Sequence, residues 1–262
     1  MQFTQIRSAT AIVNYAGVRF LIDPMLGAKG SIPALPAEIC PNPPQAMPLH
    51  DLPLPVDEIV AQVDAILATH LHFDHFDEAA VKLLPHDLPI ICQDAKDALQ
   101  LKAWGFSEIL VLTHTGIDFK GIKLTKVGAM HGEPCKIEAV YESIHMRGQA
   151  CGVIFTAPNE PTFYLAGDTI YCAYVEAALD MFKPQVMAVN ACGASVRNHG
   201  HIIFDVADMR KLHAYAPTVQ VIATHMDNVG HATVWRPDLK ALKQELNWQN
   251  LAIPADGETL VY

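Results

Sequence analysis

The feature that most constrains this chain is a run of metal-binding side chains directly after a short apolar segment. The apolar segment is Ala-Ile-Leu-Ala at 65–68, and the run is His70-x-His72-x-Asp74-His75. Such a segment predicts a buried strand, and the helical pattern at 77–84 places the run in a strand-to-helix turn. Imidazoles and carboxylates are ligands for zinc, manganese and iron(II). One histidine would favour an ordinary polar turn, whereas three histidines with an aspartate favour a metal site.

The rest of the chain alternates strand patterns with helical patterns. Hairpins are expected at 11–22 and 118–127, and paired strands at 151–156 and 162–166. Further strands are expected at 89–92, 109–112, 186–189, 219–223, 251–253 and 259–261. Helices are expected at 56–62, 77–84, 94–104, 171–181, 204–215 and 237–246. This mixture predicts a layered α/β architecture with mixed sheets. No long polar linker divides the 262 residues, so a single domain over 1–262 is expected.

A proline-rich loop at about 27–55 interrupts this regular pattern. Its prolines are Pro33, Pro36, Pro41, Pro43, Pro44, Pro48, Pro53 and Pro55. Proline fixes φ and lacks an amide hydrogen, so neither a regular helix nor a central strand is predicted here. Long loops in compact domains are commonly functional or disordered. Two interpretations remain open, a flap over a site and a surface wrap that covers a sheet edge.

Charge and composition narrow the classes of partner. The formal net charge of −10 disfavours binding to nucleic acid or an anionic membrane. The chain has no secretory-signal pattern at its start and no apolar run of the roughly 18 residues that a bilayer requires. Its cysteines form no C-x-x-C pair, which favours reduced thiols. We therefore expect a cytoplasmic protein with a small-molecule substrate, and a homo-oligomer stays open.

Three later residues follow apolar runs and could complete a metal site. Asp168 follows Phe-Tyr-Leu-Ala-Gly at 163–167, and His225 follows Val-Ile-Ala-Thr at 221–224. His131 follows a run that Gly128 interrupts. The active sites of layered α/β folds collect at strand ends, so these three positions are the expected additional ligands.

In this order, the motif H-x-H-x-D-H, a lone histidine, a Gly-Asp-Thr aspartate and a last histidine resemble the metallo-β-lactamase superfamily. The resemblance extends over most of the chain and implies a four-layer αββα sandwich with two mixed β-sheets and two metal ions at one edge. By matching motif, one ion would take His70, His72 and His131. The other would take Asp74, His75 and His225, and Asp168 would bridge the two. Zinc is the family expectation, and manganese or iron accepts the same nitrogen and oxygen ligands.

This ligand set predicts a hydrolase. Two metals about 3.5–4 Å apart can share a water and lower its pKa towards about 7, which provides a metal-bridging hydroxide. Asp74 is the expected catalytic residue, because it could orient this hydroxide or move its proton. We expect hydrolysis of a small lactone, ester or phosphoester. The alternatives are a phosphodiesterase or nuclease of the same fold, and a metal-binding module without turnover.

The segment from Leu21-Ile22-Asp23-Pro24 to Thr69-His70 is similar to the superfamily branch that contains ascorbate-6-phosphate lactonase. So is His225-Met226-Asp227 with a later His231. That lactonase is a longer protein, so its substrate is not carried over.

Four further residues are candidates for contacts around the site. His199 and His201 could bind a polar group of the substrate, or they could belong to a solvated turn that caps a helix. Asp227 and His231 follow His225 and could orient a ligand imidazole, and simple loop polarity is the alternative.

Overall fold

The structure is a computed structural model that describes residues 1–262, and it contains two mixed seven-stranded sheets. The first sheet has the order β16 (Thr259–Val261), β1 (Gln2–Arg7), β2 (Thr10–Tyr15), β3 (Val18–Ile22), β4 (Ala65–Ala68), β5 (Ile90–Cys92) and β6 (Ile109–Val111). The second has the order β15 (Leu251–Ala252), β14 (Gln220–Thr224), β11 (Val186–Asn190), β10 (Phe163–Leu165), β9 (Cys151–Thr156), β8 (Ile122–Gly128) and β7 (Ile117–Phe119). Half of each sheet is parallel. These strands are β3, β4, β5 and β6 in the first sheet, and β10, β11, β14 and β15 in the second.

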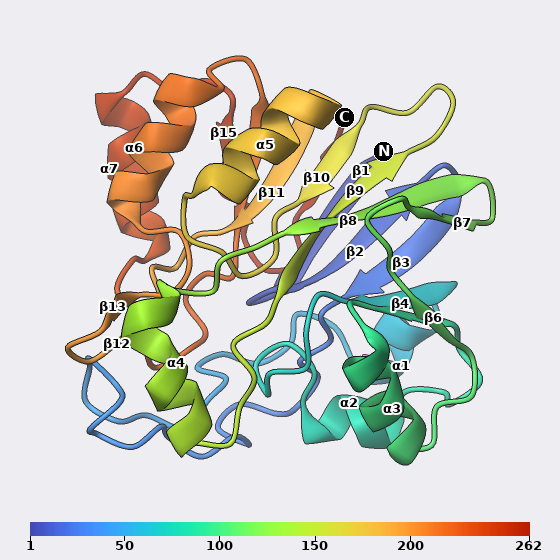
Figure 1. Ribbon diagram of the computed structural model, residues 1–262, viewed down its shortest axis with the longest axis horizontal. Helices are drawn as coiled ribbons and strands as arrows, with labels where there is room; N and C mark the ends of the chain where they lie inside the picture. Colours follow the sequence, from blue (N-terminus) through green and yellow to red (C-terminus); the bar gives the residue numbers. More distant parts are fainter.

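Helices cover the outer face of each sheet, as Figure 1 shows. The first sheet carries α1 (Val56–Val60), α2 (Glu78–Leu83) and α3 (Ala95–Ala103). The second carries α5 (Ala173–Phe182), α6 (Val206–Tyr215) and α7 (Arg236–Glu245). This is the predicted four-layer αββα sandwich. No helix is long and apolar enough to cross a membrane.

Three apolar cores correspond to the three interfaces between these layers. The core between the sheets contains Val13 and Phe155, among others. The core under α1 to α3 contains Ile12 and Leu101, and the core under α5 to α7 contains Leu212. Val13 and Ile12 are neighbours in β2 and enter different cores, because successive side chains of a strand point to opposite faces.

Some elements were not predicted from the sequence. Strand β1 has the sequence Gln-Phe-Thr-Gln-Ile-Arg, in which Gln5 and Arg7 are fully buried. Because so many of its residues are polar, the sequence did not indicate a buried strand. Helix α4 (Pro134–Ser143), which buries Ile137 and Tyr141, was also not predicted. The hairpin of β12 (Ser195–Val196) and β13 (Gly200–His201) is too short to leave a pattern.

The proline-rich loop contains no helix or strand, and only an isolated bridge joins Ile32 to Met47. Hydrogen bonds between the loop and distant segments of the chain hold it in place. Arg197 donates from Nε to the carbonyl oxygen of Ala37 at 2.8 Å, and Asn42 donates to that of Ala232 at 2.6 Å. Figure 1 shows this blue loop next to α4, at the end of the molecule where the sheets open.

Candidate metal centre

The seven predicted metal ligands lie together where the strands of both sheets end. The strands β4, β8, β10 and β14 precede the H-x-H-x-D-H turn, His131, Asp168 and His225 respectively. Three groups of these residues have ligand atoms within 4.8 Å of one another. They are His70, His72 and His131; His70, His75 and Asp168; and Asp74, His75 and His225. We call these seven residues the ligand cluster, and all of them are buried.

A local constraint explains the glycine before Asp168. Gly167 has φ +65°, and a Cβ at this position would overlap the carbonyl oxygen of Cys151. Only glycine adopts this conformation at so close an approach without strain. The Gly-Asp-Thr sequence therefore allows the chain to turn sharply after β10 and to direct Asp168 into the cluster.

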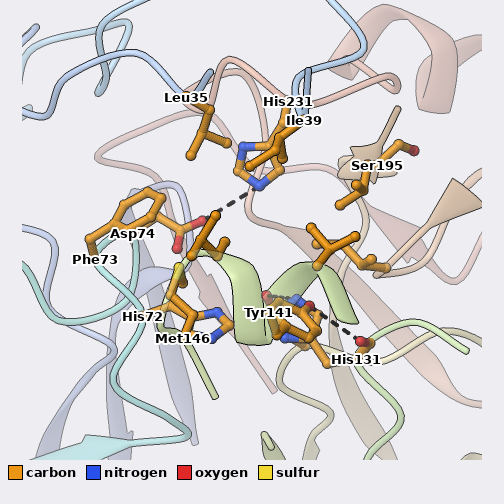
Figure 2. Close-up of a pocket in the computed structure, with 15 residues that line it drawn as sticks. Leu35, Ile39, His72, Phe73, Asp74, His131, Tyr141, Met146, Ser195 and His231 are labelled. Carbon is orange, nitrogen blue, oxygen red and sulfur yellow. Dashed lines mark hydrogen bonds and ion pairs between the residues drawn. The ribbon is translucent and has the colours of Figure 1, made fainter. Parts of the chain in front are cut away.

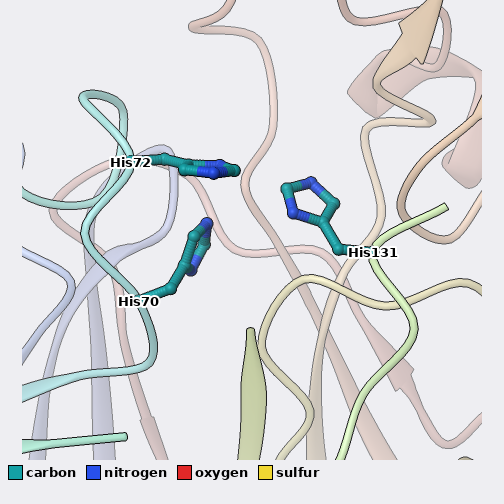
Figure 3. A group of neighbouring side chains, drawn as sticks. All are labelled: His70, His72 and His131. Atoms are coloured by element: carbon teal, nitrogen blue, oxygen red, sulfur yellow. The ribbon is translucent and has the colours of Figure 1, made fainter. Parts of the chain in front are cut away.

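The hydrogen bonds of His70 and His72 fix which ring nitrogen faces the cluster. The hydroxyl of Thr69 donates its only hydrogen to Asp23 at 2.7 Å. It can therefore only accept a hydrogen bond from Nδ1 of His70, which lies 3.1 Å away. The proton of His70 is therefore on Nδ1, and Nε2 keeps its lone pair. His72 donates from Nε2 to the carbonyl oxygen of Arg147 at 2.6 Å, which leaves Nδ1 as its lone pair. Figure 3 shows these two rings with His131 around one point.

His131 completes this first group. Neither of its ring nitrogens has a hydrogen-bond partner, and Nε2 of His70 has none either, although all three atoms are buried. Burial lowers the pKa of His131 to about 3. Its ring is thus neutral at physiological pH, which is the form that binds a metal. Buried polar atoms without partners are costly, and a metal ion would satisfy them.

The second group is built on His75 and His225. His75 donates from Nδ1 to Asp23 at 2.8 Å, so its Nε2 faces the cluster. This Nε2 lies 3.1 Å from Nε2 of His225, which lies 3.5 Å from Oδ2 of Asp74. Two nitrogens at this distance compete for one proton, and a metal ion bound by both would replace that proton. A carboxylate that supports a ligand histidine is a common feature of metal sites.

Asp168 lies between the two groups. Its Oδ2 is 3.2 Å from Nε2 of both His75 and His131, and its Oδ1 accepts a hydrogen bond of 2.6 Å from Asn190. Burial alone raises the pKa of Asp168, but His75, whose own pKa is raised, outweighs burial and holds the pKa of Asp168 well below its usual range. The residue is therefore a carboxylate with one oxygen directed at both groups. The donor set of the cluster, nitrogen and oxygen only, fits divalent metal ions.

Of the four further candidates, only His231 lies at the cluster. Its Nε2 is 4.0 Å from Oδ2 of Asp74, its Nδ1 has no partner, and its ring lines the cavity above the cluster. Asp227 instead forms an ion pair of 2.8 Å with Arg236. His199 and His201 do not line this cavity.

These two histidines have structural contacts elsewhere. His199 contacts the carbonyl oxygen of Lys136 through Nδ1, and His201 pairs with Asp208 of α6 at 3.0 Å. Hydrogen bonding to Asp208 raises the pKa of His201. Asp208 also accepts from the backbone of Tyr171 and from Lys211, so it is fully engaged in contacts around the start of α6.

Several residues that support the cluster were not predicted from the sequence. Asp23 accepts from the backbone and hydroxyl of Thr69 and from His75, and Ser8 contacts Nδ1 of His225 at 3.2 Å. Asp23 follows β3 and Asn190 ends β11. The rule that polar residues at strand ends mark a site would have found both. Ser8, Asp23 and His225 also have positive φ, a conformation that non-glycine residues adopt mainly where surrounding contacts enforce it.

A small apolar cavity of about 40 Å³ lies above the cluster (Figure 2). His72, Asp74, His131 and Asp168 form its polar side. Its apolar side is formed mainly by six residues that we call the cover: Leu35, Ile39, Val140, Tyr141, Ile144 and Met146. Because Leu35 and Ile39 belong to the proline-rich loop, this loop is a flap over the site rather than only a wrap around a sheet edge.

The fold and the ligand cluster define a protein class, and comparison with known proteins gives the same class. The family model described as "Beta-lactamase superfamily domain" matches residues 18–226, so the chain belongs to this superfamily. The UPF0173 protein YddR of Bacillus subtilis (strain 168) is 36% identical over 263 residues, which cover 100% of both chains. The chain therefore also belongs to the UPF0173 group.

Two solved structures are similar over nearly the whole chain. One is an isothiocyanate hydrolase from Delia radicum gut bacteria, with 36% identity, a TM-score of 0.93, and coverage of 100% of this chain and 99% of that one. The other is a possible metal-dependent hydrolase from Veillonella parvula DSM 2008, with 35% identity, a TM-score of 0.93, and coverage of 99% and 98%. The chain is thus a metal-dependent hydrolase of the β-lactamase fold, as the sequence predicted.

Proposed function

We propose that this protein is a binuclear metal-dependent hydrolase that acts on small, uncharged organic molecules with an electrophilic carbon. Isothiocyanates are the first class proposed, and small lactones and esters are the second. Zinc is the expected metal, and manganese or iron is the alternative. In this proposal, His70, His72 and His131 hold one ion, Asp74, His75 and His225 hold the other, and Asp168 contacts both.

The observation that carries the proposal is the composition of the cavity above the ligand cluster. Nine of its fifteen lining residues are hydrophobic, and none is lysine or arginine. Such walls favour an apolar organic group, because a polar or charged group would lose its contacts with water there without gaining hydrogen bonds in return. The 36% identity to an isothiocyanate hydrolase over the full chain supports the same chemical class.

Phosphoesters fit this cavity less well than a carbon electrophile does. Besides metal ions, many enzymes that bind phosphoryl groups place arginine or lysine on the phosphate oxygens, and no such side chain lines this cavity. The net charge of −10 also disfavours the nuclease alternative. A buried cluster beneath a cavity disfavours a metal-binding module without turnover.

The residues around the cavity have distinct roles in the proposed reaction. Metal ions, when bound, would polarise the substrate and make a water acidic enough to react at neutral pH. Asp74 lines the cavity and is placed to orient this water and accept its proton. Asn190 holds Oδ1 of Asp168 and leaves Oδ2 for the cluster. The cover excludes bulk water from the reacting atoms.

For an isothiocyanate, R–N=C=S, the proposed reaction adds water to the central carbon. The oxygen forms the new bond to carbon, and the resulting thiocarbamate loses its carbon–nitrogen bond. The nitrogen gains both protons of the water and leaves as the amine R–NH₂, while the carbon leaves as carbonyl sulfide. Atoms balance without any oxidant or reductant.

A substrate panel tests this proposal. Protein loaded with zinc or manganese is assayed with 2-phenylethyl isothiocyanate, γ-butyrolactone, phenyl acetate and bis(p-nitrophenyl) phosphate, and its metal content is measured. We expect the highest kcat/KM for the isothiocyanate, and a value at least about a hundredfold lower for the phosphodiester. Preference for the phosphodiester, or well under two metal ions per chain, would contradict the proposal.

Two further expectations belong with this proposal. The six cysteines are all free thiols, which supports a cytoplasmic location. Turnover of γ-butyrolactone above that of the isothiocyanate would instead favour the branch that contains ascorbate-6-phosphate lactonase.

A further inference from the structure

The cavity above the ligand cluster is too small to hold a whole substrate. Its volume of about 40 Å³ has room for roughly three atoms of the size of a water molecule. The three-atom N=C=S group, or the reacting atoms of an ester, would fill it. The organic group of the substrate must therefore lie outside this inner chamber.

We propose that the organic group binds in an adjoining outer cavity and that Met146 separates the two spaces. The outer cavity has a volume of about 420 Å³, and Met130, Ile137, Ala150 and Tyr174 are among its lining residues. This inference rests on the proposed function, because it assigns a place to the apolar part of the same substrate.

Shared walls connect the outer cavity to the inner chamber. His131, Tyr141 and Met146 line both spaces. His131 is a ligand of the cluster, so a group in the outer cavity lies one side chain away from the reacting atoms. Gly148 also contributes, because a Cβ there would lie 2.7 Å from Cδ2 of Tyr141. Glycine at this position lets the ring of Tyr141 pack against the chain between the two spaces.

The chemistry of the outer cavity suits an aromatic or alkyl group. It contains the side chains of two tyrosines, two methionines and Ile137. Its polar residues include Glu138, Glu142 and Gln149, which are exposed, and Arg147, which is paired with Asp94 and Asp97. Aromatic groups pack well against tyrosine rings, and methionine sulfur makes favourable contacts with aromatic rings.

A second cavity, of about 400 Å³, borders the inner chamber on the side of α3 and is less suitable. It shares His72, Phe73 and Met146 with the inner chamber, but its other walls include Gln93, Lys96, Asp97 and Gln100. An apolar group placed there would displace water from the exposed Lys96 and Gln100 without giving these side chains new hydrogen bonds, which is costly. We call this space the α3 cavity, and it provides the control for the test.

Met146 can move without disturbing the ligand cluster. The next residue, Arg147, is fixed by ion pairs to Asp94 and Asp97 of the α3 region, and its carbonyl oxygen accepts the hydrogen bond from His72. The backbone at this point is therefore held in place. The side chain of Met146 has three rotatable bonds, so its rotation alone can join the inner chamber to the outer cavity.

The test compares methyl isothiocyanate with 2-phenylethyl isothiocyanate in matched variants. Ala150→Leu fills part of the outer cavity, and Gln100→Leu places the same leucine side chain in the α3 cavity, where it replaces a polar amide with an apolar group. We expect Ala150→Leu to lower kcat/KM for the 2-phenylethyl substrate about tenfold, as expected for the loss of much of the burial of one ring, and to leave the methyl substrate unchanged. Gln100→Leu should leave both unchanged.

A second variant tests the same cavity independently, in case Ala150→Leu does not fold. Tyr174→Ala removes a half-exposed wall of the outer cavity and should lower only the 2-phenylethyl value, by about threefold to tenfold. The inference is wrong if both outer-cavity variants leave the ratio of the two substrates unchanged, or if Gln100→Leu alone changes it.

A binding measurement separates failure of this inference from failure of the proposed function. Protein labelled with ¹³C at the methionine methyl groups is titrated with the neutral probe 2-phenylethanol. We expect shifts of the Met130 and Met146 methyl resonances, no shift of Met187 in the core under α5 to α7, and loss of the shifts in Ala150→Leu. Absence of isothiocyanate turnover with these shifts present would contradict only the proposed substrate, whereas absence of the shifts in the wild-type protein would overturn the outer cavity as a binding site.

Discussion

Two regions meet at the inner chamber, the ligand cluster below it and the cover above it, and they are built differently. The ligands come from turns that follow strands of both sheets, and Asp23, Thr69 and Asn190 hold them with short hydrogen bonds. The cover comes from the proline-rich loop and from α4 with the segment that follows it, and it contacts the chamber through apolar side chains. Hydrogen bonds are directional and apolar contacts are not. In the proposed function, the cluster therefore carries the reaction and the cover selects the substrate.

The largest effect should follow removal of the carboxylate between the two groups of ligands. In Asp168→Ala, we expect loss of at least one metal ion per chain and a decrease of kcat/KM of more than about a hundredfold, because the oxygen shared by both groups is gone. Metal analysis and steady-state kinetics measure both quantities. Unchanged turnover would show that Asp168 does not bridge the two groups.

A smaller effect is expected at Asp23, which touches the cluster only through its ligands. Asp23→Asn keeps the shape but replaces one of the two acceptor oxygens with an amide group. The hydrogen bonds that fix the proton of His75 directly, and that of His70 through Thr69, are therefore weakened. Metal affinity should fall about 10- to 100-fold, as it does for similar supporting residues. Competition with a chelator measures this affinity. Retention of the wild-type affinity would mean that backbone position alone orients these histidines.

The cover should affect the substrate and not the metal. Leu35→Ala removes apolar surface from the flap, and we expect KM for an apolar substrate to rise about threefold to tenfold with the metal content unchanged. Leu99→Ala is the matched control, because Leu99 is exposed on α3, away from the chamber. Loss of metal from Leu35→Ala would indicate that the cover also stabilises the cluster.

The smallest effect concerns His201, which belongs to neither region. Its pKa is raised in the folded protein by Asp208, so its contribution to stability is complete below the unfolded pKa of about 6.5 and is lost as the pH rises through the folded pKa. The pKa of Asp208 is lowered, so its contribution is lost as the pH falls below about 4. His201→Gln should therefore reduce the free energy of unfolding by about 0.5–1 kcal/mol near pH 5–6, and by less above pH 8.

Denaturant unfolding of both proteins across this pH range measures the difference. The kcat/KM of His201→Gln should equal that of the wild-type protein. A large loss of activity would instead return His201 to the substrate contacts that the sequence suggested.

The sequence predicted the fold, and the seven residues it proposed as ligands lie together in the structure, because both leave local signals. Apolar segments of four or five residues, such as 65–68 and 221–224, predict buried strands, and a polar residue after each strand predicts a ligand. Asp23 and Asn190 satisfy the same rule, but neither matches a ligand position of the superfamily motif series, so neither was named as a candidate. Helix α4 was not predicted, although it begins with Pro134 and proline at the first helical position favours the start of a helix.

The four additional candidates show where such local signals end. His199, His201, Asp227 and His231 all lie in polar segments near a strand or helix boundary, and the sequence offered the same argument for each. Folding directs His231 into the cavity and turns Asp227 towards Arg236. Which of these side chains reaches the cluster depends on the path of the surrounding backbone, which residue type does not encode.

By itself, the sequence determined which side chains can bind metal. It also showed that each of them follows a strand and therefore lies at the edge of a sheet. Strand alternation and strand-end positions are local properties, so they can be recognised along the chain. Only the tertiary structure decided that Leu35, Val140 and Met146 close an apolar chamber over those ligands. These residues come from separate, irregular or weakly patterned segments, and apolar contact carries no directional signal that would identify its partner in advance.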